Sequence, residues 1–362
     1  MLAEDVEIPA MAVCRTTSET SAPAVDNRVV PAIDCLHVLE NHSDYVNASV
    51  VLPNGFVATG SSDMTICIWD TSTGECVRSL WGHESDVCSL AVLPTGQLAS
   101  GDLSTIRIWD IETGRGLREM QMTMDAVDFL AALPDGYLVS GSSSNTTRIW
   151  DVGTGTCVRV LRGIVCLKSF VVLRNGQVII GSSERSIYVW NPRTRKCEEM
   201  PNAHTSYINC AVLFPNGDIA SGSDDKTIII WNPLTGDRVR RLSGHCRRVE
   251  SLSLLPNYNI ISKSADGVVH MWNPTTGESL SRLEGSTSEG WIMGFLPNGY
   301  IVNSYRRNTI RIQDAITGVY VGALTGHSEV VSSVEVLPNG NVFTVSEDLT
   351  ARIWGMRGYI LT

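Results

Sequence analysis

The sequence predicts an all-β protein folded as a single β-propeller, and three observations carry this prediction. A unit of 40 or 41 residues recurs eight times, a Trp returns near the end of almost every unit, and a Pro- and Gly-containing turn returns in the middle of most. Within a unit, short apolar stretches alternate with tight polar turns, which favours strands over helices. Four short antiparallel strands per period of about 40 to 45 residues are typical of one propeller blade.

The period is fixed to within one residue by two sets of markers. The residues that open the units are Cys35, Cys76, Gly116, Cys157, Cys197, Arg238, Ser279 and Tyr320. The Trp near the end of each unit keeps the same spacing, with Gln313 in its place in the seventh unit: Trp69, Trp109, Trp150, Trp190, Trp231, Trp272 and Trp354.

One unit illustrates the four predicted strands. Residues 76–80, CVRSL, alternate in polarity, and residues 87–94, VCSLAVLP, form the nearly continuous apolar run expected of a strand buried on both faces. After the turn at Pro94 and Gly96 come QLASG and then TIRIW, which starts at Thr105.

The two ends of the repeat predict how the ring closes. In a regular unit the outer strand begins seven residues after the Trp, but only GMRGYILT follows Trp354. The last blade therefore lacks its own outer strand, and residues 35–40, CLHVLE, supply it. We expect a closed ring of eight blades over 35–362, with seven as the alternative because the seventh unit is degenerate. Residues 1–34 match no unit, and their Ser-, Thr-, Ala- and Pro-rich run predicts a flexible tail.

The units resemble WD repeats, a family named for a Trp-Asp pair. That pair stands here at Trp69-Asp70, Trp109-Asp110 and Trp150-Asp151, and the family's Gly-His element stands at Gly82-His83, Gly244-His245 and Gly326-His327. The resemblance covers the chain from Cys35 onward. It specifies the fold, whereas one fold carries many functions.

The resemblance implies a hydrogen-bonded set of His, Ser or Thr, Asp and Trp inside a blade. Matching sets occur in the first, fifth, sixth and eighth units: His42, Thr59, Asp63 and Trp69; His204, Ser221, Asp225 and Trp231; His245, Ser262, Asp266 and Trp272; His327, Thr344, Asp348 and Trp354. Repeated catalytic triads would be the functional interpretation, but a triad on every blade has no use and the Trp blocks access, which favours a structural role.

Three units depart from this pattern. The third has Thr123 and Ser144 at the His and Asp positions, the fourth has Ile164, Ile180 and Glu184, and the seventh has Ser286, Asn303, Arg307 and Gln313. We expect these blades to depend more on apolar packing, or to be surfaces reshaped for a partner.

Composition excludes several classes of function. The formal net charge of -10 argues against nucleic-acid and anionic-membrane binding, which need basic surfaces. The ten cysteines form no C-x-x-C pair, and four of them, Cys35, Cys76, Cys157 and Cys197, share one phase of the repeat and so fall on different blades. No metal site or cofactor is expected, and the chain is expected to be cytoplasmic, with the nucleus as an alternative.

We expect a non-enzymatic scaffold or adaptor that binds a protein or peptide, as a monomer or as a subunit of a larger complex. A propeller hydrolase is the alternative from another class, but it would need clustered carboxylates or a metal at the mouth of the ring. The residues at that mouth are chemically mixed: Tyr45, Asp86, Ala126, Tyr207, Arg248, Glu289, Val330, and Cys166 or Leu167.

Resemblance to the family places the partner on the face that carries the loops after the Gly-His elements. That face receives Tyr45, Arg185, Tyr207, Arg247, Arg248, Trp291, Arg306 and Arg307. Arg and exposed aromatic residues are enriched at interface hot spots, and paired Arg suits carboxylate or phosphate groups. Two specific versions stay open, a reader of acidic or phosphorylated peptides and a ubiquitin-binding adaptor. The alternative is that these arginines are scattered solvated charges and that Trp291 belongs to the core.

Overall fold

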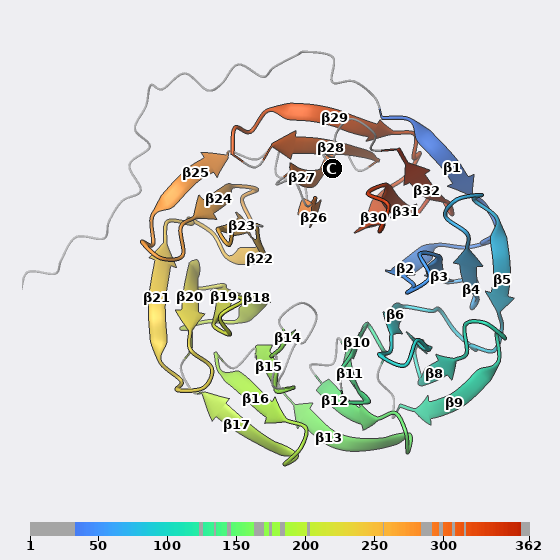
Figure 1. Cartoon of the computed structure of the whole chain (residues 1–362), viewed down its shortest axis with the longest axis horizontal. Helices are drawn as coiled ribbons and strands as arrows, with labels where there is room; N and C mark the ends of the chain where they lie inside the picture. The colour runs from blue at the N-terminus through green and yellow to red at the C-terminus, as the bar shows by residue number, and fades with distance from the viewer. Residues whose placement is uncertain are drawn as a thin grey trace, which may run out of the picture.

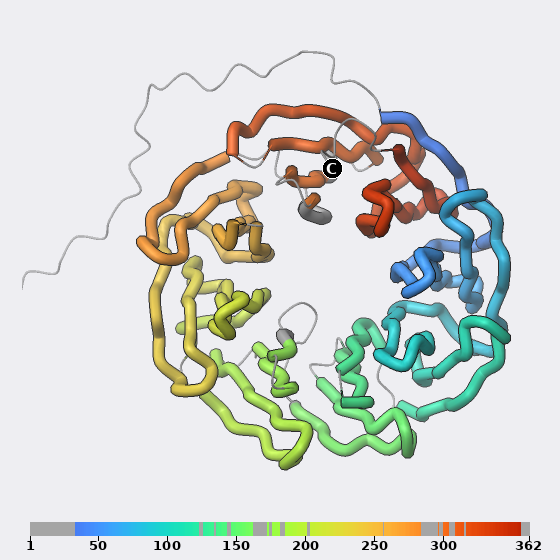
Figure 2. The backbone as a smooth tube through the Cα atoms, in the orientation of Figure 1, coloured from blue at the N-terminus to red at the C-terminus, as the bar shows by residue number. Residues whose placement is uncertain are grey.

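Eight four-stranded antiparallel sheets stand around a ring in a computed structural model of the chain (Figure 1). The structure describes residues 33–122, 126–133, 135–142, 146–162, 170–173, 176–181, 185–200, 203–255, 257–283, 292–296, 300–305, 308–314 and 316–355. Each sheet is one blade, and the blades follow one another in chain order (Figure 2). The predicted eight-bladed propeller is therefore confirmed.

The first four blades run from the innermost to the outermost strand in sequence order. Their strands are, in blade 1, β2 (Val46–Val51), β3 (Val57–Ser61), β4 (Ile66–Trp69) and β5 (Cys76–Leu80); in blade 2, β6 (Ser89–Val92), β7 (Leu98–Gly101), β8 (Thr105–Trp109) and β9 (Gly116–Gln121); in blade 3, β10 (Phe129–Ala132), β11 (Tyr137–Ser142), β12 (Thr146–Asp151) and β13 (Thr156–Arg162); in blade 4, β14 (Phe170–Val172), β15 (Val178–Gly181), β16 (Ile187–Asn191) and β17 (Lys196–Met200).

Blades 5 to 7 repeat this order, whereas blade 8 takes its outer strand from the start of the chain. Their strands are, in blade 5, β18 (Ile208–Leu213), β19 (Ile219–Ser223), β20 (Thr227–Trp231) and β21 (Arg238–Ser243); in blade 6, β22 (Val249–Leu254), β23 (Ile260–Ser264), β24 (Val269–Trp272) and β25 (Ser279–Leu283); in blade 7, β26 (Ile292–Phe295), β27 (Tyr300–Tyr305), β28 (Thr309–Asp314) and β29 (Tyr320–Thr325); in blade 8, β30 (Val331–Val336), β31 (Val342–Ser346), β32 (Ala351–Trp354) and β1 (Cys35–Leu39).

The ring closes through β1, as the sequence predicts. β1 pairs antiparallel with β32, with Cys35 opposite Trp354 and Leu39 opposite Ala351 (Figure 1). Without β1, the third strand of blade 8, β32, would have an open edge. Packing begins two residues before the predicted boundary, because Ile33 is buried and its backbone N–H donates to the carbonyl of Ala323 in β29. The division into a tail and a propeller otherwise stays a prediction, since residues 1–32 lie outside the described residues.

The hydrophobic core is a circle of clusters between neighbouring blades. Between blades 1 and 2, for example, Leu52 and Ile68 pack with Leu98 and Trp109. Ile33 joins the cluster between blades 7 and 8. Each sheet packs both faces against its neighbours, which explains why second strands such as β3 and β19 are buried along their whole length rather than on alternate residues.

The antiparallel order divides the turns between two faces of the ring. We call the upper face the one that carries the links between blades and the turns between the second and third strands. The lower face carries the turns between the first and second and between the third and fourth strands. No helix that could span a membrane occurs among the described residues.

Candidate functional site

The polar sets inside the blades are continuous chains of hydrogen bonds in blades 1, 5 and 8. In blade 1 the Nδ1 atom of His42 lies 2.8 Å from Asp63, and its Nε2 atom lies 2.8 Å from the Thr59 hydroxyl. The indole N–H of Trp69 donates to the same hydroxyl at 2.7 Å. Corresponding atoms in blades 5 and 8 lie 2.8 to 2.9 Å apart. In these three sets the His, the Asp, the hydroxyl and the indole N–H are thus all hydrogen-bonded, although the sets are largely buried.

The carboxylates of these sets stay ionised. Burial alone would raise the pKa of Asp348, but hydrogen bonds from Thr350 and His327 outweigh it and bring the pKa to about 2. The pKa of Asp225 is lowered in the same way, against burial, by His204 and Thr227.

Blade 2 contains a complete set that the sequence analysis missed. His83 lies 2.7 Å from Asp102 and 2.6 Å from Ser100, and Trp109 donates to Ser100 at 2.7 Å. The turn before β8 is shorter here, so the Asp follows the His by 19 residues rather than 21. The Gly82-His83 pair was the signal that could have found this set.

Blade 6 does not form its predicted set completely. His245 lies 2.6 Å from Ser262, and Trp272 donates to Ser262. The expected bond from His245 to Asp266 is absent, and among the described residues the buried Nδ1 atom of His245 has no hydrogen-bond partner. Asp266 instead accepts a bond from the backbone N–H of Val268, the residue that replaces the Thr found in blades 1, 5 and 8.

The departing blades use other contacts. In blade 4, Ile180 replaces the hydroxyl residue, and in the described part of the chain the buried indole N–H of Trp190 has no acceptor. In blade 7, Asn303 donates to Gln313, which in turn donates to the carbonyl of Gly318. Blade 3 keeps the bond from Trp150 to Ser140. The remaining variant positions lie outside the described residues: Thr123, Ser144, Ile164, Glu184, Ser286 and Arg307.

These sets cannot act as catalytic triads on a substrate. The hydroxyl residues Thr59, Ser100, Ser221 and Thr344 are between 0% and 1% exposed, and each hydroxyl is occupied by an indole N–H. No cluster of three potential metal ligands occurs among the described residues. Cys35, Cys76, Cys157 and Cys197 are free thiols on the outer strands of different blades.

The structure divides the predicted partner-binding residues between two sides of the upper face. Arg185, Tyr207, Arg247 and Arg248 are exposed and follow one another over blades 4, 5 and 6. Tyr45 belongs to blade 1, which stands across the ring from blade 5 (Figure 1). Trp291, Arg306 and Arg307 lie outside the described residues.

We call the side of the upper face over blades 4 to 6 the cationic side, and its positive charge is partly neutralised. The Nε and Nη2 atoms of Arg248 both donate to Glu250 at 3.1 Å. For Arg185 and Arg247, no ion pair occurs within the described ranges. The side is therefore cationic, but less so than the sequence alone suggests.

The opposite side carries a group of exposed apolar side chains on adjoining loops, of which the sequence analysis predicted only Tyr45. We call it the upper apolar patch; its exposed fractions are Tyr45 52%, Met64 45%, Trp81 74% and Leu103 50%. The loops that carry these residues are joined by hydrogen bonds, from the N–H of Ser62 to the carbonyl of Tyr45 and from the N–H of Leu103 to the Ser85 hydroxyl. Trp81 falls outside the regular Trp spacing, which was the available signal.

The fold and its buried polar sets define a repeat propeller held together by tryptophan-anchored, non-catalytic hydrogen-bond chains. The family "WD domain, G-beta repeat" matches residues 33–70, 74–110, 195–232, 236–273 and 318–355, which is just over half of the chain. The chain belongs to this WD40 family.

Parts of the chain are similar in sequence to other curated proteins. Nuclear distribution protein nudF from Emericella nidulans is 29% identical over 199 residues, which are 51% of this chain and 44% of that protein. Phospholipase A-2-activating protein from Xenopus laevis is 33% identical over 76 residues, 19% of this chain and 10% of that protein. The chain thus spans less than half the length of these curated relatives. The crystal structure of the computationally designed Ika8 protein superposes with a TM-score of 0.71 at 28% identity, covering 88% of this chain and 99% of that one.

Proposed function

We propose that the protein is a non-enzymatic interaction scaffold whose upper face binds a peptide or a partner domain. The single observation that carries the proposal is the upper apolar patch. Large apolar side chains cost free energy when they face water, and groups of them exposed on one face are features of protein interaction sites. Trp is the residue type most enriched among interface hot spots, and Trp81 is the most exposed aromatic residue in the described part of the chain.

The framework beneath the patch supports this role. Trp81 lies two residues before His83, which is fixed by its hydrogen bonds to Asp102 and Ser100. Met64 occupies the turn of blade 1 with a φ of 67°, next to Asp63 of the blade 1 set. A rigid base reduces the conformational entropy lost on binding, so the buried sets contribute to recognition by holding the loops in place.

The cationic side of the upper face favours an acidic or phosphorylated peptide as the specific partner. Arg185, Arg247 and Tyr207 lie there with exposed side chains, and guanidinium groups bind carboxylate and phosphate through charge-assisted hydrogen bonds. A ubiquitin-binding adaptor is the second version of the same proposal. A hydrolase is disfavoured. It would need the carboxylates predicted at the mouth of the ring, Asp86 and Glu289, and Asp86 already accepts a hydrogen bond from the Ser62 hydroxyl.

The proposed location is the cytoplasm or the nucleus. Eight cysteines are free thiols in the described part of the chain, which fits a reducing compartment. The proposal allows a monomer or one subunit of a larger complex.

Quantitative affinity purification tests the scaffold role. We would compare wild type with Trp81→Ser/Leu103→Ser, with Arg185→Glu/Arg247→Glu, and with Leu234→Ser, an exposed residue on the lower face. The first double variant should lower the recovery of specific partners at least tenfold, the charge reversal should remove acidic, phosphorylated or ubiquitin-bearing ones, and Leu234→Ser should change nothing. If neither double variant alters the partner set while the fold is retained, the upper face is not the binding site.

A further inference from the structure

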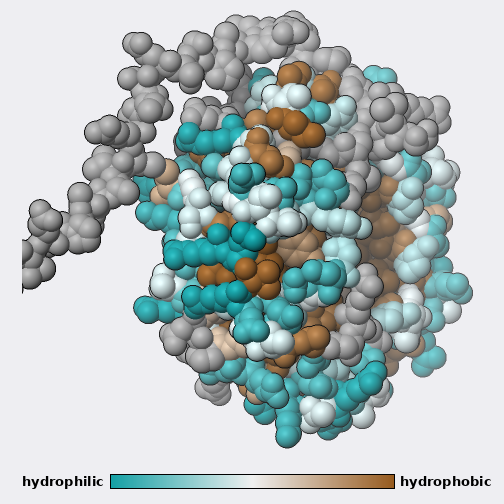
Figure 3. Space-filling model, turned by 60° about the vertical axis from the view of Figure 1, so that its left-hand side comes forward, coloured by the Kyte–Doolittle hydropathy of each residue, from teal (hydrophilic) through white to brown (hydrophobic). Residues whose placement is uncertain are grey.

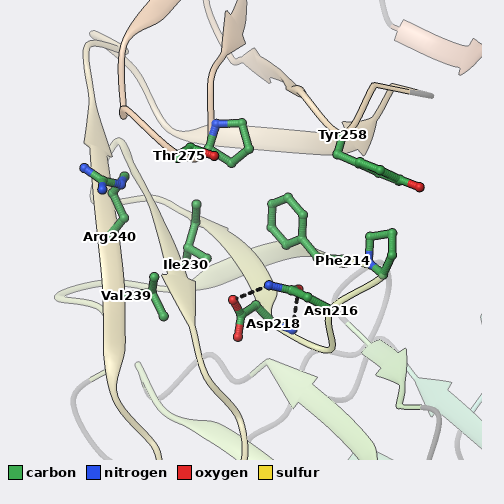
Figure 4. Close-up of a pocket in the computed structure, with 10 residues that line it drawn as sticks. Phe214, Asn216, Asp218, Ile230, Val239, Arg240, Tyr258 and Thr275 are labelled. Carbon is green, nitrogen blue, oxygen red and sulfur yellow. Dashed lines mark hydrogen bonds between the residues drawn. The ribbon is translucent and has the colours of Figure 1, made fainter.

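A pocket of about 450 Å³ opens between blades 5 and 6 on the lower face, the side opposite the proposed scaffold surface. Ile230 and Val239 of blade 5 form one wall, Phe214 stands on the other side, and Tyr258 of blade 6 lies at the mouth (Figure 4). The volume falls in the range of about 300 to 1,000 Å³ that is usual for ligand sites. Figure 3 turns this side of the ring forward and shows hydrophobic side chains gathered between hydrophilic ones.

Both aromatic residues of the pocket break the repeat. The turn between the first and second strands reads Leu at its first position and Gly at its fourth in most units, as in Leu52 and Gly55 of blade 1. Phe214 is the only exception at the first position, and Tyr258 is the only exception at the fourth.

Tyr258 occupies a backbone conformation that favours glycine. Its φ is 65°, close to the values of 84° at Gly55 and 82° at Gly96, and its side chain is 53% exposed. A bulky residue in the left-handed region is strained, and such strain gathers at functional sites. A half-exposed Tyr gains little from packing that would offset this strain. The two exceptions belong to neighbouring blades, and they meet at one pocket.

Two charged side chains, Asp218 and Arg240, line this apolar space. The Asp218 carboxylate accepts a bond of 2.8 Å from Asn216, and none of the described cations pairs with it. Arg240 at the edge donates one bond to the carbonyl of Thr276, while its buried Nε atom has no partner within the described ranges. The pocket therefore offers one carboxylate acceptor and one cation among its lining residues.

The edge beside the pocket suits an extended chain. β21, which carries Val239 and Arg240, is the outermost strand of its sheet, so one edge of its backbone pairs with no strand in the described sheets. Arg241 is exposed on the same strand and adds positive charge in a protein of net charge -10. An unpaired strand edge next to an apolar pocket is a common mode of peptide recognition.

We propose that this pocket binds an extended peptide by inserting one Trp or Tyr side chain. The ring packs against Phe214 and Tyr258, its N–H or O–H donates to Asp218, and an acidic residue beside it faces Arg240. The shared physical basis is an apolar cavity with one acceptor for the polar end of the ring and one cation for the adjacent carboxylate.

Selection from a phage-displayed library of random short peptides tests the proposal. Peptides selected on wild type would be measured against Phe214→Leu/Tyr258→Gly, a double variant that restores the residues of the other repeats and should therefore fold with unchanged or higher thermal stability. Phe214 belongs to the buried cluster between blades 5 and 6, so its change to Leu loses some packing that the relief of strain at position 258 offsets, and thermal unfolding checks that the variant keeps its fold. We expect a class of peptides with a Trp or Tyr next to Asp or Glu, whose affinity falls at least tenfold on the folded double variant. Asp218→Asn should weaken the same class, and Leu234→Ser, on the neighbouring turn outside the pocket, should leave it unchanged.

Two results would overturn the proposal. One is that no selected peptide loses affinity on the double variant. The other is that the peptides lose affinity on Trp81→Ser/Leu103→Ser instead, which would assign them to the upper face. Because the two surfaces lie on opposite faces of the ring, failure of the pocket leaves the scaffold proposal intact, and the reverse also holds.

Discussion

Blades 5 and 6 are neighbours built from units of equal length, yet only blade 5 completes its polar set. In blade 5, Thr227 donates its hydroxyl to Asp225 at 2.6 Å, and Asp225 lies 2.9 Å from His204. In blade 6, Val268 stands at the Thr position, and His245 loses its Asp partner. The two blades thus differ in one hydroxyl group, and in blade 5 this hydroxyl orients the carboxylate toward the His.

The missing bond changes the protonation of the His. Burial, with His270 next to it, lowers the pKa of His245 to about 4. The two rings lie edge to face with centroids 4.6 Å apart, and His270 also stacks on Trp272. Blade 6 therefore replaces a charged acceptor with ring contacts, which hold the His in place and keep it neutral.

The largest expected effect comes from removing the Asp of each blade. Asp225→Ala should lower the free energy of unfolding by about 3 kcal/mol, because it leaves a buried His and Thr without their acceptor. Asp266→Ala should cost less than about 1 kcal/mol, since among the described residues that carboxylate accepts a hydrogen bond from the backbone N–H of Val268 alone. Urea unfolding of the two variants measures the difference. Equal losses would show that the bonds seen in blade 5 add no stability.

As the pH falls, blade 6 should lose stability at a higher pH than blade 5. The unfolded chain binds a proton at His245 with a pKa near 6.5 and the folded chain with a pKa of about 4, so between these values the unfolded state holds more protons. Stability therefore falls as the pH drops through this window, by about 2 kcal/mol from His245 between pH 7 and pH 5. The lowered pKa of Asp225 changes the free energy of unfolding only below about pH 3.8, the pKa of this carboxyl in the unfolded chain, because only there does the unfolded chain take up a proton that the folded chain does not.

Urea midpoints at the two pH values check this prediction. Burial also lowers the pKa of His270 and His327, which adds to the loss in the wild type. A His245→Gln variant should therefore lose less stability on acidification than the wild type. A pH-independent midpoint over this range in the wild type would contradict the assignment.

The smallest effect tests the single hydroxyl. Val268→Thr should turn Asp266 toward His245, raise the pKa of His245, and increase the free energy of unfolding by about 1 kcal/mol. Thr227→Val should do the reverse in blade 5. Thermal unfolding and the NMR titration of His245 measure the two effects. If the titration of His245 is unchanged in Val268→Thr, the hydroxyl is not what separates the blades.

The sequence by itself determined the features that repeat. The spacing of Trp69 to Trp354, and the extra strand sequence at residues 35–40 before the first Trp, predicted eight blades closed by that strand, with seven as the alternative. These features depend on the local periodicity of strands and turns, which each unit encodes in its own 40 or 41 residues.

Tertiary structure decided how residues of different units meet. It placed Tyr45 and Tyr207 across the ring from each other, and it brought Phe214 of blade 5 and Tyr258 of blade 6 to the same pocket. It also decided which polar sets close: the one containing His83 does, although its spacing is shorter, and the one containing His245 does not. A repeat pattern gives each residue a place within its blade, but a hydrogen bond forms only within a few tenths of an ångström of its preferred donor–acceptor distance, and only the packed ring fixes side-chain positions that closely.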